Sequence, residues 1–170
     1  MADKDKQEVW LRGPLEGIHP ILQPIAHALL QAREEVNEMM EGFPDEFLVI
    51  KPMGVASVGF HLQHLTGVLD RLFTYATGAL LTQKQLHALA SEGKLSSKDY
   101  NLNILLTDFN QEIDKAIRQL METDAATLTE IRGVGRAQIP STVIGLYTHA
   151  AEHTMRHVGQ LLVTVRILKG

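Results

Sequence analysis

The sequence predicts an all-α protein, a four-helix bundle with long crossover connections. Four long segments repeat apolar residues at three- and four-residue spacing, the period of a helix with one buried face. Two links between these segments are long enough to cross such a bundle. The chain has 170 residues, of which 45% are hydrophobic and 21% charged. This balance is typical of a globular protein, so we expect one domain over residues 1–170.

The first helix is predicted over residues 21–40, after a polar N-terminal arm at residues 1–13. Pro20 precedes this helix, where a first turn tolerates a missing amide proton. The run Gly42-Phe43-Pro44 ends the pattern. Residues 47–53 are too few for a long helix and partly β-branched, so we expect an extended segment that crosses the bundle.

The second helix is predicted to begin after Ser57, a good N-cap residue, and to continue to about Leu81. Gly67 lies inside it and indicates close packing against another helix. The apolar period then fades, which leaves room for a short helical extension through Leu89. Residues 91–94 are predicted to be a connection.

The third helix is predicted over residues 99–122, with a clear apolar stripe. Residues 128–140 contain Gly133-Val134-Gly135 between short alternating runs, which indicates an irregular turn or a small hairpin. We expect Ser141 to cap the last helix, which continues to about Leu168.

Charge and composition exclude several classes of function. Sixteen Lys and Arg against twenty Asp and Glu give a net charge of −4, so no basic excess exists to bind nucleic acid. No run approaches the roughly 18 apolar residues that span a membrane, and no apolar leader follows the N-terminus, so we expect a cytoplasmic protein. The chain has no Cys, so any thiol in its chemistry comes from outside.

Eight His occur in the chain, and five of them fall in two clusters. Successive helical residues turn by about 100°, so His153 and His157 point only about 40° apart on one helix face. His149 extends this row by one turn, and Gln160 falls between the two His directions. The row therefore carries three imidazoles and an amide at a spacing typical of metal ligands.

The other cluster is His61 and His64, three residues apart on the second helix. Either ring can face inward while the other flanks it. Both clusters lie in strongly apolar helices, where coordination or a hydrogen bond must offset the cost of burying an imidazole. We therefore predict a divalent metal site, with Zn²⁺ or Ni²⁺ as the expected ion. A hydrogen-bonded His cluster without metal is the alternative.

The two His-bearing segments, SVGFHLQHL at residues 57–65 and HAAEHTMRHVGQ at residues 149–160, resemble the DinB/YfiT superfamily. In that family the second helix carries an inward His after a Ser-Ile/Val-Gly-like start. Its last helix carries two His four apart, then one residue and Gly-Gln. The resemblance extends over about residues 14–170 and implies a DinB-like bundle. It also implies three ligands of one divalent metal ion, namely His64, His153 and His157.

The family includes thiol S-transferases, in which a metal activates a low-molecular-weight thiol, and metal-dependent hydrolases. The resemblance thus implies a metalloenzyme with a small-molecule substrate, and a homodimer, which is common in the family. A structural or sensing metal site without catalysis is the alternative. Five further residues are expected to support the ligands or contact the substrate: His61, His149, Gln160, Arg71 and Tyr75.

A competing motif uses some of the same residues. His149, Glu152 and His153 fit the inverted zinc-protease pattern H-x-x-E-H, in which both His bind metal and the Glu is the general base. Glu152 points about 100° away from His153, so this interpretation is less favoured. The two hypotheses differ in one ligand pair, His149 with His153 or His153 with His157.

Overall fold

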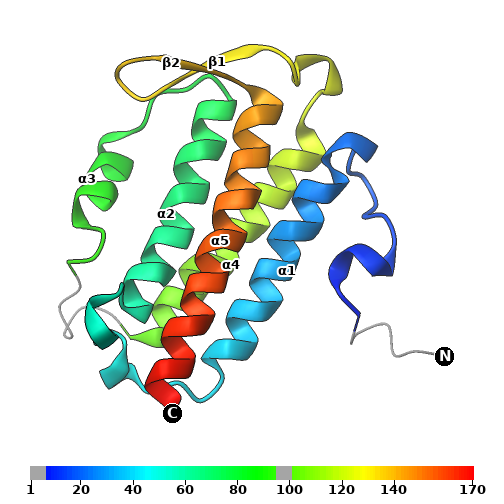
Figure 1. Cartoon of the computed structure of the whole chain (residues 1–170). Helices are drawn as coiled ribbons and strands as arrows, with labels where there is room; N and C mark the ends of the chain where they lie inside the picture. Colours follow the sequence, from blue (N-terminus) through cyan, green and yellow to red (C-terminus); the bar gives the residue numbers. More distant parts are fainter. Residues whose placement is uncertain (1–6, 95–100) are drawn as a thin grey trace.

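A computed structural model of the chain describes residues 7–94 and 101–170 (Figure 1). Four long helices surround one core, which confirms the predicted all-α four-helix bundle. They are α1 (Gln23–Met40), α2 (Val58–Ala76), α4 (Leu102–Glu122) and α5 (Val143–Lys169). The bundle places the two His-bearing helices, α2 and α5, directly against each other.

The helices follow each other around the bundle in the order α1, α5, α2, α4 (Figure 1). α1 and α5 run in one direction, and α2 and α4 run in the other. Because α2 and α4 are parallel, the chain between them must return along the whole bundle. This crossover carries a short helix, α3 (Gln83–Ser91), along the outer side of α2.

Apolar stripes on the four long helices meet in one core. In α4 the buried residues recur at the helical period, and each is at most 3% exposed. Burying such a large apolar side chain is worth about 1.5–3 kcal/mol. The core therefore holds α2 and α5 at a fixed separation. The α4 residues concerned are Leu105, Phe109, Ile113, Ala116 and Leu120.

The predicted start of α2 is confirmed, since the Ser57 hydroxyl accepts from the Phe60 amide at 3.3 Å. The predicted end at Leu81 is wrong. Gly78 adopts φ +83°, which is accessible to glycine and stops the helix after Ala76. The expected extension is the separate helix α3, which Thr82 opens through a capping box.

Two other helix starts differ from their predictions. α4 begins after Asn101, whose side chain accepts from the Ile104 amide at 2.9 Å. The predicted start at residue 99 lies outside the described residues. Thr142 rather than Ser141 caps α5, since the Thr142 hydroxyl accepts from the Gly145 amide at 3.1 Å.

That strand belongs to the small hairpin expected between α4 and α5. β1 (Ile131–Val134) and β2 (Ile139–Thr142) pair antiparallel at the end of the bundle where α4 stops and α5 starts (Figure 1). The hairpin joins α4 to α5, two antiparallel helices that lie diagonally opposite in the bundle, so it carries the chain across the end of the bundle.

The extended segment predicted at residues 47–53 is wrong. Two 3-10 turns, Asp45–Phe47 and Pro52–Gly54, form there instead. Leu48 between them is 3% exposed, and its carbonyl accepts from the Gly59 amide at 2.8 Å. The link is thus pinned to the first turn of α2.

The N-terminal arm is less independent than expected. Val9–Arg12 forms a 3-10 turn in which Val9 is buried. The Val9 amide donates to the Gln31 side chain at 2.9 Å, and Arg12 forms a two-pronged ion pair with Glu34 at 2.7 Å. The described part of the arm therefore packs on α1.

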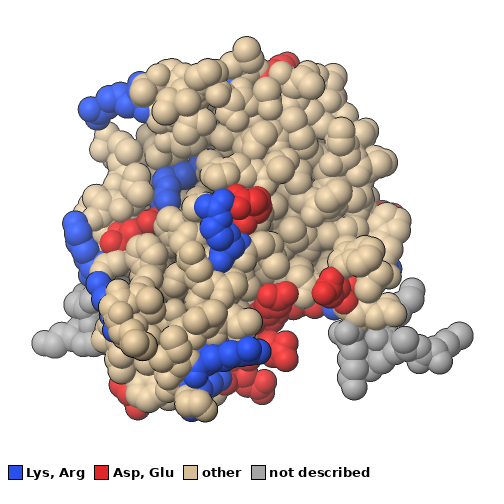
Figure 2. All heavy atoms as spheres, in the orientation of Figure 1, with Lys and Arg blue, Asp and Glu red and all other residues tan. Residues whose placement is uncertain are grey.

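Charged side chains of both signs are scattered over the face shown in Figure 2. The described residues form no continuous basic surface on that face, in line with the net negative charge. None of the helices within residues 7–94 and 101–170 is both long and apolar enough to cross a membrane.

Candidate metal centre

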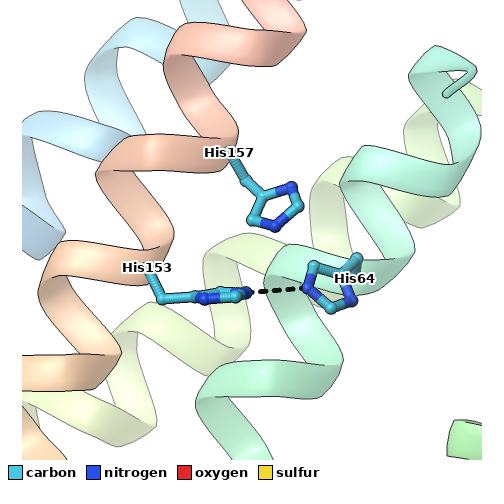
Figure 3. A group of neighbouring side chains, drawn as sticks. All are labelled: His64, His153 and His157. Carbon is cyan, nitrogen blue, oxygen red and sulfur yellow. Dashed lines mark hydrogen bonds between the residues drawn. The ribbon is translucent and has the colours of Figure 1, made fainter. Parts of the chain in front are cut away.

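Three imidazoles converge between α2 and α5. His64 points from α2 toward His153 and His157, which lie one turn apart on α5 (Figure 3). One ring nitrogen from each residue lies within 4.8 Å of the other two. The antiparallel contact of these helices brings together residues about ninety positions apart, as the resemblance implied.

The rings are close enough to share one small ion. His64 Nε2 lies 2.9 Å from His153 Nε2. The His157 ring centroid lies 4.4 Å from that of His64 and 4.6 Å from that of His153. Zinc–imidazole bonds are about 2.0–2.1 Å long, so small side-chain rotations would bring three nitrogens onto one ion.

Burial lowers the pKa of His61, His153 and His157 and so favours their neutral form. Desolvation, helped by the charge of His64, lowers the pKa of His61 to about 4. Desolvation lowers the pKa of His157 to about 4 as well, with help from neighbouring His64 and His153. The pKa of His153 is lowered for the same reasons. Neutral imidazole is the form that binds a metal ion, so the site is prepared for coordination.

His61 supports His157. It is 2% exposed, and its Nδ1 lies 3.2 Å from Nδ1 of His157. One of these nitrogens must donate and the other accept. This contact occupies His157 Nδ1 and leaves His157 Nε2 for a ligand. His61 is thus a neighbour of the three-His group and not a member of it.

Glu92 is the residue that sequence reasoning missed. It follows α3, and its Oε2 accepts from His64 Nδ1 at 2.9 Å. Its Oε1 accepts from Arg71 at 2.5 Å. Burial alone would raise the pKa of this carboxyl, but the hydrogen bonds from His64 and Arg71 lower it overall. Metal-bound His commonly donates its second ring proton to a carboxylate. This rule indicates that a carboxylate lies near a ligand, but it does not say which residue supplies it.

Arg71 and Gly67 are both explained by Glu92. Arg71 was expected near the site, and its side chain is 12% exposed and paired with this carboxylate. A Cβ at Gly67 would lie 2.5 Å from Glu92 Oε1 and 2.7 Å from Arg71 Nη1. Gly67 therefore leaves room for an ion pair, where the sequence had suggested packing against another helix.

The remaining expected residues are either exposed or part of the hydrophobic core. His149 is exposed, and its ring centroid lies 5.4 Å from that of His153. Gln160 is exposed on α5. Tyr75 is 9% exposed and belongs to the hydrophobic core, which favours packing over substrate binding.

The geometry does not favour the inverted zinc-protease motif. Glu152 is half-exposed and bonded to Arg156, one turn away. This hydrogen bond is the main reason that the pKa of Glu152 is lowered. Among the described residues, the group that can hold a metal includes His153 but not His149.

The donor set fits a divalent metal ion. Nδ1 of His153 is buried and has no hydrogen-bond partner among the described residues, while its Nε2 faces another imidazole nitrogen. A buried polar atom without a partner is costly unless something else binds the ring. Three imidazoles are a donor set that suits Zn²⁺ and Ni²⁺.

A cavity of about 730 Å³ lies between α2, α3 and α4, and the three imidazoles are not among the residues that line it. Gln63, Gly67 and Glu92 line it, so the carboxylate that contacts His64 also faces the cavity. Its volume is in the range of small-molecule sites.

Comparison with known proteins identifies the family of this chain. Residues 28–161 match the family model of the DinB superfamily, a span that contains all three imidazoles and most of the chain. A search of curated proteins finds no match to the chain. Because the matched span covers well over half of the 170 residues, the chain belongs to the DinB superfamily.

Proposed function

We propose that this protein is a metalloenzyme in which His64, His153 and His157 hold one divalent ion, Zn²⁺ or Ni²⁺. The observation that carries the proposal is the convergence of three partly buried imidazoles from two helices. When bound, such an ion lowers the pKa of a coordinated thiol or water so that the anion exists near neutral pH. The substrate class is a small molecule.

We favour an external low-molecular-weight thiol over water as the nucleophile, as in a thiol S-transferase. The chain has no Cys of its own. Two carboxylates contact or flank the imidazoles. Glu92 accepts hydrogen bonds from His64 and Arg71, and Glu152 accepts one from Arg156. Neither is a free general base for water, and a thiolate needs less proton handling. Metal-dependent hydrolysis is the competing activity.

The experiment measures both activities in protein loaded with Zn²⁺ or Ni²⁺. One assay supplies glutathione, cysteine and other small thiols with an alkylating dye, and the other supplies activated esters without thiol. The proposal expects metal-dependent thiol transfer that is lost in His157→Ala and kept in Glu152→Gln. Metal-dependent ester hydrolysis without transfer from any thiol would contradict the thiol preference and leave hydrolase activity.

A structural or sensing metal is the non-catalytic alternative. The three rings join only α2 and α5, which the apolar core already holds together. We therefore expect the chelated protein to keep its helical circular dichroism and to rebind metal. Unfolding on chelation would instead assign the ion a structural role.

We also propose a homodimer. Val163 and Ile167 expose apolar surface on α5 that a second copy would cover. Sedimentation velocity at several protein concentrations tests the assembly, and a monomer throughout would contradict it. The expected cytoplasmic location stays a prediction.

A further inference from the structure

We propose that Glu92 is a positioning residue for His64, and that Arg71 and Gly67 hold Glu92 in place. The inference rests on the proposed metal site and adds to it a residue outside the three ligands. It concerns how this chain orients one imidazole before any ion binds.

The hydrogen bond selects which nitrogen of His64 faces the ion. A carboxylate can only accept, so the Oε2 contact at 2.9 Å requires the proton of His64 to sit on Nδ1. The lone pair is then on Nε2, the atom that faces His153 Nε2 at 2.9 Å. Glu92 thus sets both the tautomer and the direction of the ring.

Contacts on both sides hold this arrangement. Arg71 donates to the other carboxylate oxygen at 2.5 Å, and both side chains are at most 13% exposed. The Phe60 ring stacks on His64 with planes 11° apart and centroids 5.4 Å apart. The amide of Gly93, the next residue after Glu92, donates to Gln63 Oε1 at 3.1 Å. The carboxylate is therefore bonded to two side chains of α2, and the next backbone amide is bonded to a third.

Gly67 supplies independent support. A glycine inside a helix is less favourable than alanine, because its backbone loses more conformational freedom. Here the space left by the missing Cβ is filled by Glu92 Oε1 and Arg71 Nη1, at 2.5 and 2.7 Å from the Cβ position. An added methyl group would leave the backbone of α2 intact and displace the two flexible side-chain ends.

The test compares Zn²⁺ affinity, measured by competition with a chromophoric chelator, in matched variants. Glu92→Gln keeps the shape of the side chain and should weaken binding about 10- to 100-fold. Glu152→Gln removes one negative charge near His153 without touching a ligand. Its effect should stay below about fivefold, since exposed ion pairs contribute little.

A double-mutant cycle separates positioning from general damage. Gly67→Ala should raise helix propensity yet weaken Zn²⁺ binding, because it displaces the Glu92 carboxylate. If it acts through Glu92, the double variant Gly67→Ala/Glu92→Gln should bind no more weakly than the weaker single variant. Additive losses would overturn the proposed role of Gly67.

A spectroscopic readout follows the His64 ring itself. In Zn²⁺-loaded wild type, ¹⁵N-detected NMR should show His64 with a protected proton on Nδ1, and Glu92→Gln should shift or lose that signal. If Glu92→Gln binds Zn²⁺ as tightly as wild type and leaves the His64 signal unchanged, the positioning role is overturned, but the metal site is not. If wild type binds no Zn²⁺ or Ni²⁺, the metal site fails, and the positioning role fails with it.

Discussion

At the scale of single residues, burial acts in opposite directions on imidazoles and on a carboxyl. It lowers the pKa of His61 and His157 to about 4, which keeps both rings neutral. It raises the pKa of Glu112, whose side chain is 12% exposed, even though Lys115 lies beside it. The same desolvation thus prepares the His group for metal and makes the ionised Glu112 costly.

Glu112→Gln should stabilise the protein at neutral pH and have little effect in acid. Below its ordinary pKa the carboxyl is protonated in both states. As the pH rises from that value through the raised pKa, the folded state holds more protons than the unfolded state, so stability falls. Glutamine has no such loss, so the advantage of the variant should grow across this window.

Urea unfolding at an acidic and a neutral pH measures this difference. The control is Asp114→Asn, which removes an exposed partner of Arg33 and should change stability by less than about 1 kcal/mol at either pH. A Glu112→Gln variant that is less stable than wild type at neutral pH would show that the bond to Lys115 outweighs the burial cost.

At the scale of elements, α3 differs from the four long helices because none of its residues is buried. The first turn of α3 is held by the Thr82 capping box and by the hydrogen bond from Gln85 to Thr74. Its other end is held by Glu92, which accepts a hydrogen bond from Arg71 of α2. The helix lies on the crossover that delivers Glu92 to His64. Its local stability should therefore be separable from that of the bundle.

Removing a cap should have different consequences in α3 and α4. Thr82→Ala and Asn101→Ala each remove a side-chain cap worth about 1 kcal/mol. Thr82→Ala should speed hydrogen exchange in α3 roughly fivefold and leave global unfolding unchanged. Asn101→Ala should lower the global free energy of unfolding, because α4 contributes to the core. Equal global losses in both variants would contradict the separation.

Local patterns predicted most elements, and long-range contacts explain the errors. The helical period within α5 aligned His153 with His157, because both lie on one regular element. That His64 faces His153 and His157 from another helix was predicted only from the family resemblance. Glu92 could not be found in this way, because the path of the crossover places it beside His64. Similarly, both Ser141 and Thr142 are residues that commonly cap a helix, and only the structure shows that α5 starts after Thr142.

At the scale of the whole molecule, the core and the candidate metal centre are separate sources of order. The core joins four helices around residues such as Phe109, which has no exposed surface. The three imidazoles lie at the edge of this core between only two of those helices. Folding should therefore depend chiefly on the core, and metal binding on α2 and α5.

Phe109→Ala should destabilise the fold without removing the metal. Deleting a fully buried aromatic ring costs about 3–5 kcal/mol. Because Phe109 lies on α4, the ligands on α2 and α5 should keep their places in molecules that remain folded. Denaturant unfolding gives the loss, and the Zn²⁺ content of the folded fraction should match wild type. A folded variant without metal would contradict this independence.

The most direct test of the three-His centre is the metal content of untagged protein, measured by elemental mass spectrometry. Wild type should carry about one divalent ion per chain. His64→Ala, His153→Ala and His157→Ala should each lose it, whereas His149→Ala should keep it. Loss in His149→Ala with retention in His157→Ala would instead support the inverted zinc-protease motif. Wild type that carries no metal and binds none on addition would contradict the three-His metal centre.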